Sequence, residues 1–220
     1  MSDDLLSTRY RDAAPGDTIT FGSYPQTADG ADRTPIEWQV LQNSGEGLFL
    51  LSAYLLDCKR YHRAFVDVTW QDCDLRAWLN DTFYNAAFSA AEKDAIKVTH
   101  CADNGEGRPD TDDKVFLLSA AELTRLTEIF GKDLRRAIGT EFAKVKKADG
   151  CHLYVYDKSV ASDYVTTEDG QKHGCSWWWL RTQLGEASRA AFVGTHASIR
   201  SYGRVNLTPY GVRPAIKLAL

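Results

Sequence analysis

The sequence lacks the short motifs that identify the common classes of enzyme. Its 220 residues contain no P-loop, no G-x-G-x-x-G and no G-x-S-x-G, and its five histidines show no H-E-x-x-H or similar spacing. Nucleotide binding, α/β-hydrolase chemistry and zinc-protease chemistry therefore have no support. The sequence leaves any cofactor unknown and indicates no metal ligand. An active site would have to be assembled from residues far apart in the chain.

Long apolar runs are also missing. No stretch approaches the ~18 apolar residues of a membrane-spanning helix, and the acidic start, Met1–Leu6, lacks the basic region and apolar core of a signal peptide. Apolar residues make up 44% of the chain and aromatic residues 11%, which favours a folded globular protein over a disordered one. We expect a cytoplasmic protein with no membrane partner.

Cysteines are few, odd in number and widely spaced. The chain has five, at positions 58, 73, 101, 151 and 175, and no C-x-x-C pair, which argues against a zinc ribbon or a thioredoxin-like motif. We expect reduced thiols that are buried as small apolar side chains. A contact between Cys58 and Cys73, or between Cys151 and Cys175, is left open.

Strand patterns and helix patterns occur in separate blocks of the chain. Predicted strands cover residues 18–24, 36–41, 48–53, 114–118, 152–156, 175–182, 190–193, 199–207 and 212–218, and predicted helices cover residues 74–84, 89–96, 119–130 and 132–147. Capping boxes open two helices, from Ser89 to Glu92 and from Ser119 to Glu122. This order predicts an α+β protein with mixed or antiparallel sheets and a helical middle segment. We expect a polar lead-in over residues 1–14 and a single domain over residues 15–220.

Three of the six tryptophans are consecutive, at positions 177–179. In a strand, Trp177 and Trp179 would share one face with Arg181, and Trp178 would lie on the other face with Leu180. A segment this apolar on both faces is typical of a central core strand. We interpret the tryptophans as scaffold and Arg181 as the polar end of the strand that emerges at a surface.

A candidate ligand-binding surface follows in the last fifty residues. Residues 171–220 hold seven basic residues and one acidic residue, whereas residues 1–170 hold 19 basic and 29 acidic residues. Period two along residues 199–207 places planar cations, an aromatic ring and an amide on one strand face. The predicted ligand-binding set is Arg181, Arg200, Tyr202, Arg204, Asn206 and Tyr210. The alternative is an ordinary solvated face whose arginines pair with acidic residues of the same chain.

Other candidate sites are weaker. Asp110–Asp113 offers carboxylates at loop spacing, but it lacks the twelve-residue EF-hand pattern, which favours a solvated turn over a calcium site. His173 lies near Cys175 and His100 precedes Cys101, but adjacency along the chain rarely gives the geometry of a cysteine nucleophile. We expect no catalytic residue and no metal site among these groups.

The motifs together resemble a bacterial domain family of unknown function. The matching segments run from Gly22–Gln26 through Ile36–Leu41, Leu50–Cys58, Thr69–Asn80, Phe83–Phe88 and Lys114–Ser119 to Trp178–Arg181 and Gly211–Ala215. That family is similar in its C-terminal half to the C-type-lectin-like fold shared with formylglycine-generating enzymes. The resemblance implies that the tryptophan-rich strand and the terminal Gly-Val-Arg-Pro strand are core elements and that the strands and loops between them display a ligand-binding surface.

Three functions are compatible with these observations. The first is a non-enzymatic recognition module for a glycan, an anionic peptide or a protein partner. The second, implied by the resemblance, is an oxidase related to formylglycine-generating enzymes, with Cys151 and Cys175 as its thiol pair. The third is a structural or assembly role. The acidic isoelectric point, about 5.7, argues against nucleic acid as a partner.

Overall fold

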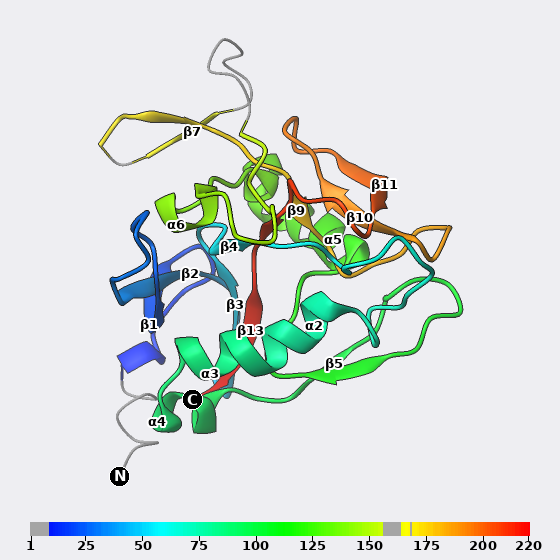
Figure 1. Cartoon of the computed structure of the whole chain (residues 1–220). Helices are drawn as coiled ribbons and strands as arrows, with labels where there is room; N and C mark the ends of the chain where they lie inside the picture. Colours follow the sequence, from blue (N-terminus) through cyan, green and yellow to red (C-terminus); the bar gives the residue numbers. More distant parts are fainter. Residues whose placement is uncertain (1–8, 156–163, 168) are drawn as a thin grey trace.

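The computed structural model of the chain describes residues 9–155, 164–167 and 169–220. Its first sheet has four antiparallel strands in the order β1 (Thr18–Tyr24), β2 (Thr34–Asn43), β3 (Gly47–Ser52) and β13 (Ala215–Ala219) (Figure 1). The expected hairpin of β2 and β3 and the strand at residues 18–24 are confirmed.

The second sheet has five short strands and is built largely from the C-terminal residues. Its order is β11 (Ile199–Arg204), β10 (Arg189–Val193), β9 (Trp178–Trp179), β12 (Gly211–Val212) and β4 (Asp57–Cys58). Strand β9 occupies the middle, as expected for the tryptophan run. Gly211 pairs in parallel with Trp178, so the two most distinctive motifs of the sequence lie side by side.

The last strand of the chain passes from one sheet to the other. Arg213 and Pro214 separate β12 in the second sheet from β13 in the first, and β13 runs between the two halves of the molecule (red in Figure 1). One continuous apolar core reaches from Tyr10 to Leu218. Tyr10 of the expected polar lead-in is buried in this core and donates a hydrogen bond to the carbonyl of Thr20.

Helices occupy the middle of the sequence. The first run consists of α2 (Asp74–Trp78), the π-helical η1 (Leu79–Phe83) and α3 (Tyr84–Ala87), and it buries Leu75, Leu79 and Phe83. Helices α4 (Ala90–Ala95) and α5 (Ala120–Phe130) both begin at the predicted capping boxes. In Figure 1, α2, α3 and α4 lie together on the same side of the molecule as the C-terminal end of β13.

Two hairpins stand outside the main sheets. β5 (Thr99–Cys101) pairs with β6 (Thr111–Asp113), and β7 (Tyr164–Thr166) pairs with β8 (Lys172–Gly174). The β7–β8 hairpin projects away from the body of the molecule in Figure 1. No helix within the described part of the chain has the length and apolar character needed to cross a bilayer.

Several predicted elements are wrong in extent. Residues 132–147 form the 3-10 helix η2 (Lys132–Arg135) and the short α6 (Glu141–Lys144) in place of one basic helix. The predicted strand at 114–118 keeps one bridge, between Phe116 and Ala215, and that at 152–156 keeps one between Val155 and Ser176, with residue 156 outside the described residues. These segments are fixed by side-chain burial and loop hydrogen bonds, which periodicity does not report. The combination of antiparallel sheets with a helical middle segment is confirmed.

Candidate ligand-binding site

A small cavity opens beside β10 and β11 in the second sheet. Its volume is about 190 Å³, and it is lined by Trp177, Phe192, Gly194, Thr195, His196, Ser198, Arg200, Tyr202 and Tyr210. We call it the aromatic pocket, because Trp177, Phe192, Tyr202 and Tyr210 contribute large aromatic rings to its lining. Its polar groups are hydroxyls, one imidazole and one guanidinium, the mixture by which an apolar pocket fixes the orientation of a ligand.

The rings pack as one cluster behind the cavity. Trp177 stacks on Tyr154 with ring centroids 4.3 Å apart, and it lies 5.6 Å from Tyr210. Phe192 meets Tyr202 edge to face at 5.4 Å and Tyr210 at 5.0 Å. Contacts of this kind add to the burial energy of each ring, so the wall of the pocket is held in place before any ligand arrives.

A glycine and an irregular register bring the pocket together. The pairing of β10 with β11 shifts by one residue between Ala190 and Phe192, which breaks the alternation expected for residues 199–207. A Cβ at Gly203 would lie 2.6 Å from the Trp179 ring and 2.9 Å from the ring of Phe192. Only a residue without a side chain lets β11 lie this close to the rings.

The rim of the pocket carries a cation and an exposed aromatic ring. Tyr202 is 58% exposed, and Arg200 is also exposed. Within the described part of the chain, the Arg200 guanidinium has no hydrogen bond or ion pair. The backbone carbonyl of Tyr202 accepts a hydrogen bond from Arg189, which in turn pairs with Glu186. Arg200 is therefore a charge at a cavity mouth that the described chain does not neutralise.

The structure brings three of the six predicted residues together. Arg200, Tyr202 and Tyr210 line the aromatic pocket; burial raises the pKa of Tyr210 to about 12, which keeps its hydroxyl protonated at neutral pH. Arg204 lies outside the pocket, with its guanidinium 4.0 Å from the centre of the Phe65 ring. The backbone carbonyl of Asn206 accepts a hydrogen bond from Arg60, while its side-chain Oδ1 is buried without a partner among the described residues.

Arg181 does not emerge at a surface, and this corrects the expectation from the sequence. Its side chain is 1% exposed and forms a two-pronged ion pair with Glu122 at 2.5 and 3.0 Å. It also donates to the carbonyls of Leu117 and Ala102 and to Asn104 Oδ1. A buried arginine needs this full set of acceptors, so Arg181 joins β9 to the start of α5 and is not available to a ligand.

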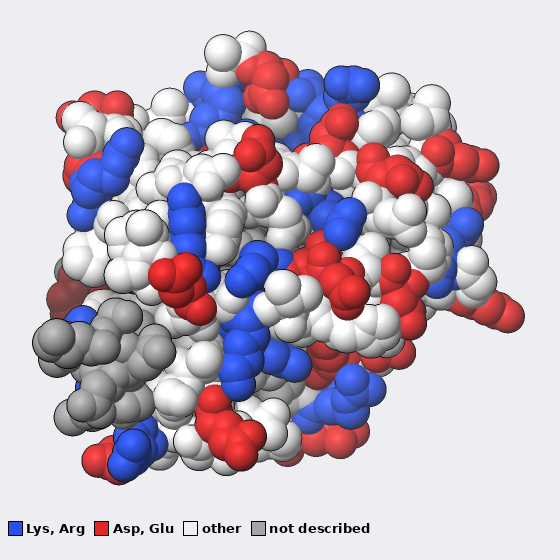
Figure 2. Space-filling model, turned by 90° about the horizontal axis from the view of Figure 1, so that it is seen from below, with Lys and Arg blue, Asp and Glu red and all other residues white. Residues whose placement is uncertain are grey.

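Within the part of the chain that the structure describes, the C-terminal excess of positive charge is neutralised only in part. Among the described residues, one ion pair links a cation of residues 171–220 to the acidic N-terminal part, that of Arg181 with Glu122. The buried Arg213 is held by the carbonyls of Ser52 and Leu134, and burial lowers its pKa to about 10. On the face seen in Figure 2, acidic and basic side chains are interspersed and form no broad basic surface.

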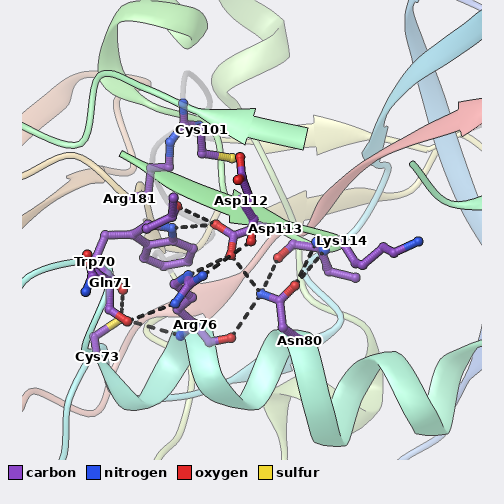
Figure 3. Close-up of polar contacts among 12 residues, drawn as sticks. Trp70, Gln71, Cys73, Arg76, Asn80, Cys101, Asp112, Asp113, Lys114 and Arg181 are labelled. Atoms are coloured by element: carbon purple, nitrogen blue, oxygen red, sulfur yellow. Dashed lines mark hydrogen bonds and ion pairs between the residues drawn. The ribbon is translucent and has the colours of Figure 1, made fainter. Parts of the chain in front are cut away.

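The Asp110–Asp113 segment has partners within the protein. Asp113 is buried and accepts hydrogen bonds from Trp70 (3.0 Å), Arg76 (2.6 Å) and Thr111 (2.7 Å), so it anchors α2 to β6 (Figure 3). Asp110 and Asp112 flank the exposed ring of His100 at 3.2 and 3.1 Å. The carboxylates point to different partners, and no cluster of three or more candidate metal ligands occurs among the described residues.

The His100–Cys101 neighbours show no activated thiol. Burial raises the pKa of Cys101 to about 12, and the ring of His100 is engaged by Asp110 and Asp112. All five cysteines are buried and free of disulfides. Neither pairing left open from the sequence, Cys58 with Cys73 or Cys151 with Cys175, forms a disulfide.

A second, larger cavity of about 810 Å³ lies where β1 and β2 face residues 136–144 and the β7–β8 hairpin. Its lining mixes acidic groups, such as Glu37 and Glu141, with basic ones, such as Arg136 and Lys144. The lining of this cavity is dominated neither by charges of one sign nor by aromatic rings. It therefore indicates a ligand chemistry less clearly than the aromatic pocket does.

Sequence reasoning missed part of the pocket wall. Trp177 was assigned to the scaffold, yet it lines the cavity together with Phe192 and the segment Gly194–Ser198. Trp177 is half-buried, unlike the fully buried Trp178 and Trp179. The signal available in the sequence was the position of Trp177 as the first residue of an apolar run. The turn that brings His196 to the cavity has no recognisable sequence pattern.

Comparisons with known proteins place the chain in a family but give no activity. No curated protein and no solved structure matches it. A family model described as a domain of unknown function, DUF6273, matches residues 45–220, whereas the resemblance drawn from the sequence was placed over residues 15–220. A domain family of unknown function is what the motifs predicted. The chain belongs to the DUF6273 family.

Proposed function

We propose that this protein is a non-enzymatic recognition module whose aromatic pocket binds an acidic sugar of a glycan. The observation that carries the proposal is Arg200, a cation without a protein partner among the described residues, at the rim of a cavity walled by aromatic rings. An unpaired cation beside preformed apolar walls is suited to a ligand that combines a negative charge with an apolar surface.

The chemistry of the pocket supports an acidic sugar in three ways. A sugar ring offers an apolar C–H face that can lie on the rings of Trp177 or Tyr202. Its carboxylate can accept two parallel hydrogen bonds from the guanidinium of Arg200. Its hydroxyls can bond with Thr195 and Ser198, which also line the cavity. A volume of about 190 Å³ suits one sugar ring better than a larger organic ligand, for which pockets of ~300–1,000 Å³ are usual.

The C-type-lectin-like fold of the C-terminal half is part of this proposal. It is supported by the central place of β9 and by its parallel pairing with β12. Fold similarity alone would not identify a ligand, so the proposal depends on the pocket and not on the resemblance.

The test is a glycan array that contains acidic and neutral sugars, followed by calorimetric titration of the best acidic glycan. We expect Arg200→Ala and Tyr202→Ala each to weaken binding at least tenfold, a loss of about 1.4 kcal/mol. Arg204→Ala is the matched control, because it removes the same charge from the same strand outside the pocket, and it should leave affinity nearly unchanged.

The outcomes separate the ligand classes. Unchanged binding in both pocket variants would overturn the pocket assignment. Binding of acidic peptides, and of no glycan, with the same dependence on Arg200 would keep the pocket and replace the glycan by a peptide. The oxidase function and the assembly role stay predictions from the sequence. Light scattering on the purified chain tests the assembly role.

A further inference from the structure

We propose that the aromatic pocket holds the terminal uronic acid of a glycan, and that the hydroxyl groups of Tyr210 and Thr195 bind the ring hydroxyls of that sugar. This inference rests on the proposed function and narrows it to a six-carbon acidic sugar bound at the end of a glycan chain. Two observations carry it. The pocket is closed at a buried inner end, and the two hydroxyl groups there have no hydrogen-bond partner among the described residues.

The lining of the pocket divides by exposure into a buried part and an exposed part. Phe192, Thr195 and Tyr210 are 3%, 6% and 3% exposed, and they form the inner end. The exposed lining residues are His196, Arg200 and Tyr202. All three belong to β11 and to the turn that leads into it from β10. The mouth of the pocket therefore lies along one hairpin, and the opposite end is closed.

The hydroxyl group of Tyr210 is held at the inner end by the packing of its ring. The ring stacks on Trp179 with centroids 3.8 Å apart and meets Phe192 edge to face at 5.0 Å. No group among the described residues accepts a hydrogen bond from this hydroxyl or donates one to it. A buried polar group without a partner costs free energy, so a ligand hydroxyl placed beside Tyr210 contributes more to binding than one placed at the exposed mouth.

The hydroxyl group of Thr195 is presented by a tightly held turn. The N–H of Gly194 donates to the carbonyl of Ser198 at 2.9 Å. Ala197 is fully buried with a φ of 56°, and its carbonyl accepts a hydrogen bond from Arg135 at 3.4 Å. A residue other than glycine keeps this left-handed conformation only where its surroundings hold it. The Thr195 hydroxyl, also without a partner among the described residues, is therefore in place before a ligand arrives.

A terminal uronic acid matches this distribution of groups. Its carboxylate is at one edge of the ring, where Arg200 offers a cation, and its ring hydroxyls can bond with the two buried hydroxyl groups at the inner end. A nine-carbon acidic sugar also carries a long side chain on its ring, for which a cavity of about 190 Å³ with one closed end leaves little space. In a 1,4-linked chain, an internal sugar has linkages on opposite sides of its ring, and the closed end leaves a path for only one of them.

The first experiment tests binding at the chain end by calorimetric titration of the full chain. The probes are galacturonic acid, glucuronic acid, the 1,4-linked trimer of galacturonic acid, and the same trimer capped at both ends with neutral glucose. We expect at least one of the two monosaccharides to bind and the uncapped trimer to bind about as tightly as galacturonic acid. The capped trimer, whose acidic sugars are all internal, should bind at least about tenfold more weakly, a loss of about 1.4 kcal/mol.

The second experiment removes one hydroxyl group at a time. Tyr210→Phe and Thr195→Val keep the shape of each side chain, and each should weaken binding of the uronic acid about fivefold, the loss of one hydrogen bond between neutral groups. Cyclohexanecarboxylate has a ring and a carboxylate but no hydroxyl group, so its affinity should be the same in both variants as in the unmodified chain. A merely structural role would weaken both ligands alike. Tyr84→Phe is the matched control, because it removes a hydroxyl group that donates to the carbonyl of Lys93, outside the pocket.

The outcomes separate this inference from the proposed function. Equal binding of the capped and uncapped trimers would overturn binding at the chain end. Unchanged affinity for the uronic acid in both hydroxyl variants would overturn the roles of Tyr210 and Thr195. Binding of a nine-carbon acidic sugar, and of neither uronic acid, would overturn this inference and leave the proposed function standing. If no acidic glycan binds, both fail. The titrations of the unmodified chain decide the sugar and the chain end even if a variant does not fold.

Discussion

The replacement of Arg181 by methionine tests whether the conspicuous arginine of the tryptophan strand is structural. Methionine keeps much of the side-chain volume but removes the charge and every donor. The variant would lose the ion pair with Glu122 and would leave the carbonyls of Leu117 and Ala102 without their donor. Glu122 would remain as a carboxylate without its cation.

The expected loss is about 3–5 kcal/mol of unfolding free energy, the usual cost of removing one partner of a buried ion pair. The lower end of this range is favoured because the Glu122 side chain is 22% exposed and water can replace part of the contact. Glu122 also closes the capping box of α5 through the backbone N–H of Ser119, so the start of that helix should loosen as well. Arg200→Met makes the same chemical change at an exposed site that has no partner among the residues described by the structure, and it should cost no more than about 0.5 kcal/mol.

The assay is urea denaturation of both variants and the unmodified chain, followed by circular dichroism and tryptophan fluorescence. Arg181→Lys keeps the charge without the two-pronged geometry and should fall between the unmodified chain and Arg181→Met, which keeps the comparison readable if the methionine variant does not fold. Equal destabilisation by Arg181→Met and Arg200→Met would refute the reasoning. So would a loss below about 1 kcal/mol for Arg181→Met, a typical value for one ordinary hydrogen bond.

Two further predictions concern packing and pH. Gly203→Ala should destabilise the protein by about 1–3 kcal/mol, because the added methyl group would overlap the Trp179 ring; Gly194→Ala, where the nearest atom is 3.7 Å away, should change the denaturation midpoint little, and equal effects would contradict the contact. The pKa of His100 is raised by its hydrogen bond to Asp112 and by Asp110. Its contribution to stability is therefore fully present below the ordinary histidine pKa of ~6.5 and is lost as pH rises through the raised value. NMR titration of the imidazole should show that pKa fall in Asp112→Asn, and an unchanged titration would rule out the pairing.

Local patterns predicted the elements whose stability is local. Both capping boxes form as expected, because the serine and the glutamate of each box satisfy backbone donors only three residues away. The hairpin of β2 and β3 and the alternation of the tryptophans were equally readable. The helix predicted over residues 132–147 failed because its basic, weakly periodic sequence gives way to contacts with distant segments. One example is the hydrogen bond from Thr140 N–H to the carbonyl of Leu55.

The candidate site was predicted in part. Arg200, Tyr202 and Tyr210 were found because cations and aromatic rings on a strand point to recognition whatever their neighbours are. Arg181 was misplaced because sequence cannot tell a buried arginine from an exposed one. The difference lies in Glu122, which is 59 residues away in sequence. Phe192 was read as part of a strand, and only the packing of β10 against β11 makes it a wall of the pocket.

The sequence by itself determined the family, the mixture of sheets with a helical middle, and the strand that carries the tryptophans, because these depend on local periodicity and on the order of short motifs. The tertiary structure decided which arginine is buried and which rings enclose a cavity. Each of these outcomes depends on contacts between residues dozens of positions apart. Such contacts are set by the packing of the whole core, which no short stretch of sequence contains.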